Sequence, residues 1–263
     1  MQWIVNAKPV LEYLKKKKPG TIDFVPTDLG CTRQADLALY MGVIKDLSKN
    51  KIISYSEENQ TISFTTENLE KYERFDQIRG NLANLYNFLI QCLRDCYCVN
   101  YFRTVNLSSF FTTEVIVSCV YNFSAGISIG INKVLKDKDG KFNLEDIAAK
   151  TRRFCFDYQM NDQLTQLTEK KKDFSKYLKS VNQKIQTFND YRDTFFAHSD
   201  KGSQKNVNSM DLSSAIDIIQ KCLTYTIEIA NTIDDQKDEE SVNDISKLLI
   251  VESHYFTKQL SGK

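Results

Sequence analysis

The chain is poor in glycine, in proline and in excess charge of either sign, and each shortage narrows the class of protein. Its 263 residues include only 9 Gly and 3 Pro, too few for the many tight turns of a β-sandwich or a β-barrel. Its 35 Lys and Arg nearly balance its 34 Asp and Glu, so the chain lacks the basic excess of a dedicated nucleic-acid binder. Any contact with nucleic acid must therefore come from a local group of residues.

Long hydrophobic runs, a leader pattern and paired cysteines are also missing. Residues 1–6 lack the charged and then apolar layout of a signal peptide. The most apolar stretch, 115–135, is interrupted by Asn122, Asn132 and Lys133, which predicts a buried helix rather than a membrane span. The 7 Cys are odd in number and lack the spacing of a zinc site. We therefore expect a cytoplasmic protein with reduced thiols, no metal, no cofactor and no membrane contact.

The common motifs of phosphate and acyl chemistry are absent as well. The sequence has no Gly-x4-Gly-Lys-Ser/Thr loop and no Gly-x-Ser-x-Gly turn. Asp137 and Asp139 begin a calcium-like loop, but the remaining ligands do not follow at the required spacing. These absences leave nucleotide hydrolysis, acyl transfer and calcium binding without support.

The first part of the chain, residues 1–66, has the pattern of a small α+β module. Apolar residues at helical spacing predict helices over 10–17 and 34–49. Two short runs, 52–55 and 61–64, flank a polar turn and predict a hairpin. Helices followed by a hairpin outline a winged helix-turn-helix. We take the following residues as candidate DNA contacts, with protein binding or dimerisation as an equally weighted role: Arg33, Gln34, Lys45, Lys49 and Lys51.

The rest of the chain reads as helix almost throughout. Apolar residues three and four apart define five segments, and Asn143 is a candidate N-cap for the third of them. We therefore predict a mainly α protein, with a helical bundle over 67–240 and a helical tail over 241–263. The five expected helices cover residues 67–103, 108–135, 144–156, 162–198 and 211–233.

One short segment near the end of the fourth predicted helix carries the candidate chemistry. It reads Tyr191-Arg192-Asp193-Thr194-Phe195-Phe196-Ala197-His198-Ser199-Asp200 and holds one of only 2 histidines in the chain. Histidine titrates near neutral pH, and an arginine six positions earlier supplies a fixed cation. Both groups on one element suit the cleavage of a phosphodiester.

With its context, this segment resembles the signature of the HEPN domain, a helical bundle named for its occurrence in higher eukaryotes and prokaryotes. That signature is an Arg, a polar residue, a few more positions and then a His, which Arg192, Asp193 and His198 match. Ala197 before the His and Asp200 after it are typical of the branch found in bacterial abortive-infection proteins.

The surroundings of the segment extend the resemblance over residues of about 70–235. The apolar stretch 115–135 is followed by a Lys/Asp turn and by Phe142-Asn143-Leu144-Glu145-Asp146-Ile147. The order of helices also matches: two long, one short, a long one ending in the motif, and a last one after a polar loop. Residues 1–66 lie outside the resemblance.

The resemblance implies a metal-independent endoribonuclease that acts as a homodimer in antiviral defence, abortive infection or toxin–antitoxin growth arrest. His198 would pass a proton as the 2′-hydroxyl of RNA attacks the adjacent phosphorus, and Arg192 would bind the phosphoryl oxygens. Asp193 would orient Arg192 or a water molecule, and Lys201 is a further candidate RNA contact. Positions six apart on a helix differ by about 120°, so one helix cannot aim both groups at one atom. Two juxtaposed copies remove this difficulty.

Other interpretations of the same residues stay open. Arg192 can pair with a neighbouring acid, and His198 can be a helix C-terminal residue favoured by the helix dipole. The chain can also be a non-catalytic DNA-binding or protein-binding regulator whose bundle dimerises. A third alternative is a nucleotide sensor whose bundle binds without cutting.

Overall fold

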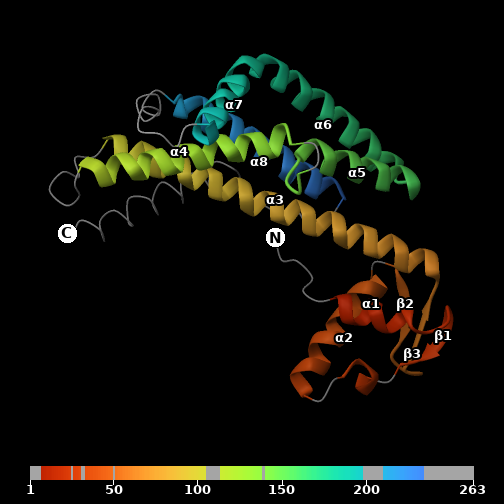
Figure 1. The fold of residues 1–263 in the computed structure, drawn as a ribbon. Coiled ribbons are helices and arrows are strands. Elements are labelled where there is room, and N and C mark those ends of the chain that lie inside the picture. Colours follow the sequence, from red (N-terminus) through yellow and green to blue (C-terminus); the bar gives the residue numbers. More distant parts are fainter. Residues whose placement is uncertain are drawn as a thin grey trace. The chain divides into compact units, whose positions relative to one another are not determined.

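The fold was analysed in a computed structural model, which describes residues 7–24, 26–30, 33–49, 51–104, 113–137, 140–197 and 210–233 (Figure 1). In these residues the chain is mainly α-helical with one small antiparallel sheet, which confirms the predicted balance of elements. It divides into two compact units, Met1–Ile78 and Arg79–Lys263. The division falls inside a long helix, because Leu69 and Tyr72 at the start of that helix belong to the core of the first unit.

The first unit combines two helices, a short 3-10 helix and a three-stranded sheet. The predicted hairpin is confirmed as β2 and β3, and β1 pairs with the other side of β3, so the strand order is β1-β3-β2. Phe64 lies opposite both Gly20 of β1 and Ile53 of β2. The elements in chain order are α1 (Ala7–Lys15), β1 (Gly20–Asp23), η1 (Pro26–Leu29), α2 (Gln34–Lys49), β2 (Ile53–Ser56) and β3 (Thr61–Phe64).

Strand β1 was not predicted from the sequence. Its four residues, Gly-Thr-Ile-Asp, have a single half-buried side chain, Ile22, so they lack the alternation that marks a strand. β1 forms because the open edge of β3 offers backbone hydrogen-bonding groups. Pairing with a segment 40 residues away in sequence is a tertiary effect that local pattern does not contain.

The core of the first unit lies between its helices and the sheet. Leu14 of α1, Ile44 of α2 and Ile62 of β3 are fully buried. This core accounts for the helical spacing of the apolar residues in α1 and α2, since one face of each helix must leave water.

The second unit is a bundle of long helices. Its third element in the chain, α5, begins as predicted: Asn143 accepts a hydrogen bond from the backbone N–H of Asp146 at 2.8 Å, which confirms Asn143 as the N-cap. The helices are α3 (Thr66–Thr104), which starts in the first unit, α4 (Thr113–Leu135), α5 (Leu144–Asp157), α6 (Asn161–Ser180), α7 (Asn182–Ala197) and α8 (Leu212–Ile233).

Three pairs of helices make most of the described packing inside this bundle. α4 packs along α7, and α6 packs against α5 and α8. Between α6 and α8 the Phe174 ring stacks on that of Tyr225 with centroids 4.3 Å apart, and the Tyr177 hydroxyl donates to Asp217 Oδ2 at 2.7 Å. The polar site described below lies where α7 and α4 meet.

The prediction of one helix over 162–198 is wrong, because two helices, α6 and α7, share that stretch. The chain turns at Val181, whose backbone N–H still donates to the Tyr177 carbonyl and whose φ of −106° and ψ of 9° leave the helical region. Val181 is 8% exposed and Ile185 is 4% exposed, so apolar spacing continues across the turn. With no Gly or Pro at the junction, periodicity alone predicts an unbroken helix.

Among the described residues, α4 is the one helix long and apolar enough to cross a membrane by length and composition. It packs against α7, α8 and α5, and Ser124, Ser128 and Asn132 on it are buried. Buried polar side chains against neighbouring helices are typical of a helix in the interior of a bundle.

Candidate functional site

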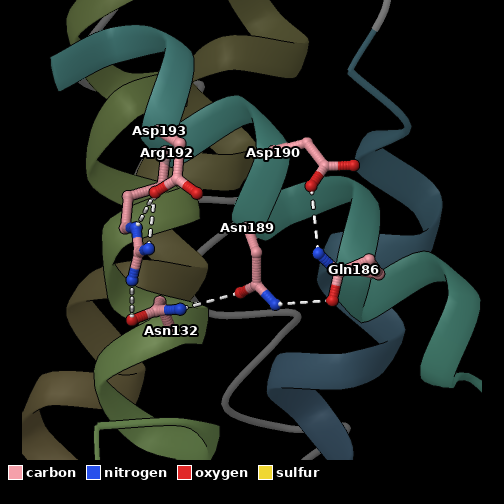
Figure 2. A network of polar contacts seen from close by, with 6 residues as sticks. All are labelled: Asn132, Gln186, Asn189, Asp190, Arg192 and Asp193. Atoms are coloured by element: carbon pink, nitrogen blue, oxygen red, sulfur yellow. Dashed lines mark hydrogen bonds and ion pairs between the residues drawn. The ribbon is translucent and has the colours of Figure 1, made fainter. Parts of the chain in front are cut away.

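The polar side of α7 faces the end of α4 across an open depression of about 520 Å³. α7 turns Ile185 and Phe188 into the core, which leaves Gln186, Asn189 and Asp193 on another side of the same helix. Figure 2 shows these side chains together with the one that α4 contributes, Asn132. The residues that line the depression are Asn132, Lys136, Asp137, Gln186, Asn189, Arg192 and Asp193.

The Arg192 guanidinium is held on two sides. Its Nε donates to Asp193 Oδ1 at 2.8 Å, and its Nη2 donates to the same oxygen. Its Nη1 donates to Asn132 Oδ1 at 2.5 Å. A guanidinium has about five N–H donors, and these bonds use three of them. The side chain is 32% exposed, so a solute in the depression can reach the remaining edge.

A chain of side-chain amides continues from Asn132 (Figure 2). Asn132 Nδ2 donates to Asn189 Oδ1 at 2.7 Å, and both residues are buried, at 7% and 6% exposed. Asn189 Nδ2 donates to Gln186 Oε1 at 3.4 Å, and Gln186 Nε2 donates to Asp190 Oδ1 at 3.0 Å. The amide chain, Asn132–Asn189–Gln186, therefore runs from a guanidinium at one end to a carboxylate at the other.

The charges around the depression balance. Lys136 at the end of α4 is exposed and is the second cation that lines it, beside Arg192. Asp137 and Asp193 are the two acids. Within the described ranges no group of three or more His, Cys, Asp or Glu side chains is placed to hold a metal ion. The chemistry that this arrangement offers is directional hydrogen bonding to an anion from a guanidinium and an ammonium.

Two of the predicted site residues, His198 and Lys201, lie outside the described residues. α7 ends at Ala197, directly before His198. The structure does bring Arg192 and Asp193 together, through the two bonds to Asp193 Oδ1.

The candidate contacts in the first unit are spread along α2 rather than gathered. Arg33 and Gln34 are exposed at its start, whereas Lys49 and Lys51 are exposed at or just beyond its end. A helix of 16 residues is about 24 Å long, so the two groups are far apart. Lys45 is in an ion pair with Glu57, with 3.5 Å between Nζ and Oε1.

Between these two groups the exposed residues of α2 are small or apolar, apart from Lys45. Leu39 is 46% exposed, and Ala38 and Gly42 beside it are also exposed. Base edges are recognised mostly by hydrogen-bonding side chains, so this face is poorly suited to sequence-specific DNA binding.

Sequence reasoning missed Asn132, Asn189, Gln186 and Lys136 as parts of the site. Asn132 interrupts an apolar helix, and that alone was a signal, because a buried amide needs partners. Its partner Asn189 lies 57 residues later, and nothing local connects the two.

Comparisons of the chain with protein-family models, with curated proteins and with solved structures find no match.

Proposed function

We propose that the chain is a metal-independent endoribonuclease that acts as a homodimer in the bacterial cytoplasm, in antiviral defence or in toxin-like growth arrest. The observation that carries this proposal is the Arg192 guanidinium, fixed by Asp193 and Asn132 yet open to a polar depression, six residues before His198. A cation held in place before the substrate arrives stabilises charge that develops in a transition state without reorganising.

The proposed reaction is transfer of the phosphodiester to the neighbouring 2′-oxygen. That oxygen bonds to phosphorus, and the bond from phosphorus to the 5′-oxygen breaks. A proton leaves the 2′-hydroxyl and a proton reaches the departing 5′-oxygen, and His198 carries protons at neutral pH. Arg192 donates to the non-bridging oxygens as their negative charge builds. The products are a 2′,3′-cyclic phosphate and a 5′-hydroxyl.

A dimer is part of the proposal for a geometric reason. Arg192 and a residue six positions later point about 120° apart on a regular helix. A second copy of the chain placed across the depression supplies the histidine that one helix cannot aim at the same phosphate.

For the first unit we propose a winged-helix-like module that contacts protein. The order α1-β1-η1-α2-β2-β3 with a β1-β3-β2 sheet supports that fold. The exposed Leu39 and Gly42 on α2 favour a protein surface or a second copy over DNA, since such a face can dock against another apolar face.

We expect the purified chain to cleave single-stranded RNA in the presence of EDTA and to leave 2′,3′-cyclic phosphate ends. Those ends follow from attack by the 2′-hydroxyl. The assay is electrophoresis of end-labelled RNA before and after treatment that opens cyclic phosphates. The matched control is the same oligonucleotide with 2′-deoxy residues, which should stay intact. Cleavage of the deoxy strand at an equal rate would contradict the mechanism.

We expect Lys136→Ala to weaken RNA binding more in dilute salt than in concentrated salt. Lys136 is the second cation of the depression, and losing one phosphate contact lowers the slope of log affinity against log salt by about 0.7 for a single strand. Fluorescence anisotropy of a labelled RNA measures the slope. Lys133→Ala is the control, since Lys133 is exposed on the same helix but does not line the depression. An equal change in both variants would mean that the effect is one of net charge alone.

A further inference from the structure

The buried pair Asn132 and Asn189 has no catalytic chemistry of its own, yet it contacts the residue that the proposed reaction needs. We propose that Asn132 is the positioning residue of Arg192, and that Asn189 sets the orientation of Asn132. Neither residue was singled out for a role by its sequence context. The catalytic consequence rests on the proposed function, whereas the orientation itself does not.

The direction of the amide chain is fixed by its two ends. A guanidinium is a donor only, so the side of Asn132 that meets Arg192 must be its oxygen. The Asn132 amide nitrogen then faces the other way and needs an acceptor, which is Asn189 Oδ1 at 2.7 Å. Asn189 Nδ2 in turn meets the oxygen of Gln186, whose nitrogen meets the acceptor-only carboxylate of Asp190. Every amide in the chain is therefore oriented consistently from the cation to the anion.

Burial makes this orientation matter most at Asn132 and Asn189. Both are under a tenth exposed, so water cannot replace a lost partner cheaply. An Asn132 side chain turned by 180° would set its NH2 group against the guanidinium and its oxygen against Asn189 Oδ1. The Asn132–Asn189 bond removes that alternative, and Arg192 stays aimed across the depression.

A change at Asn189 that keeps an acceptor should behave differently from one that removes it. Asn189→Asp still accepts from Asn132 Nδ2, so it keeps Asn132 and Arg192 aligned. It also adds a buried charge on the helix that carries Asp190 and Asp193, so it destabilises the fold more than Asn189→Ala does. Activity and stability therefore rank these two variants in opposite orders.

The experiment measures kcat for RNA cleavage and the urea midpoint for Asn132→Ala, Asn189→Ala and Asn189→Asp. We expect kcat to fall about 10- to 100-fold for both alanine variants, because small misplacements of a catalytic group cost that much. For Asn189→Asp, kcat should stay within about threefold of wild type, in spite of the lowest urea midpoint of the set. The matched control, Asn182→Ala, changes an exposed amide on the same helix and should leave both quantities unchanged.

A second readout separates this inference from the proposed function. Nuclear magnetic resonance of the Arg192 side-chain N–H groups reports whether the guanidinium is held, with or without cleavage. Slow exchange in wild type and in Asn189→Asp, with fast exchange in Asn132→Ala, supports the inference even for a chain that does not cut RNA. If kcat follows the urea midpoint through all three variants, or if Arg192 exchanges equally in all of them, Asn132 has no positioning role.

Discussion

Replacing Arg192 by alanine is expected to lower RNA cleavage by about 10²–10³-fold while leaving the fold intact. That is the usual loss when one fixed donor to a developing negative charge is removed. The Arg192 side chain is 32% exposed and that of Asp193 is 63% exposed, so removal of the guanidinium creates no cavity in the core, and the buried Asn132 loses one of its two hydrogen-bond partners. The measurement is the single-turnover rate at saturating RNA, with circular dichroism as the check on folding.

The matched variants for this experiment test the shape of the cation and the proton carrier. Arg192→Lys keeps the charge but loses the planar fork, so it should recover only a small part of the rate. His198→Ala should lose about 10²–10⁴-fold, the range for a general acid or base. Cleavage at the wild-type rate by both Arg192→Ala and His198→Ala would reject the ribonuclease proposal and favour a regulator or a nucleotide sensor. Binding of duplex DNA, or thermal stabilisation by nucleotides, would then distinguish these two.

Replacing Phe188 by alanine is expected to destabilise the second unit by about 3–5 kcal/mol, the range for deleting a fully packed phenyl ring. Phe188 is 2% exposed and lies beside Asn189 on α7, so its loss loosens the helix that carries the site. Phe156→Ala is the control, because Phe156 on α5 is 63% exposed and should cost little when it is removed.

The two units can be followed separately in this measurement. Hydrogen exchange of the backbone amides of Ile44 and Ile62, which are fully buried in the first unit, reports that unit during urea unfolding. Far-ultraviolet circular dichroism is dominated by the long helices of the second. We expect Phe188→Ala to lower the urea midpoint of the second unit and to leave that of the first unit unchanged. Equal shifts in both signals would show that the units unfold as one.

Features with local causes were predictable. The helix over 34–49 and the hairpin at 53–64 follow from apolar spacing around a polar turn. Asn143 was recognised as a cap because its side chain bonds three residues ahead, within one turn of chain. Each of these depends on interactions between near neighbours, which sequence pattern records.

Features that depend on contacts between residues far apart in the sequence could not be predicted. β1 forms because the edge of β3 has backbone hydrogen-bonding groups that need partners. The helix ends at Val181 although the apolar spacing continues across that residue. Of the candidate site, Arg192 and Asp193 were named from their types and positions, but the partner that fixes Arg192 lies on another helix.

By itself, then, the sequence determined that most of the described chain is helical, which faces of those helices are apolar, and which side chains can carry charge or a proton. Only the tertiary structure decided where the guanidinium of Arg192 points. That direction depends on Asn132 and Asn189, which are 57 residues apart and meet because α4 packs along α7. Residue types and their spacing follow from covalent order, whereas the orientation of a buried hydrogen bond is set by whatever group packing brings to face it.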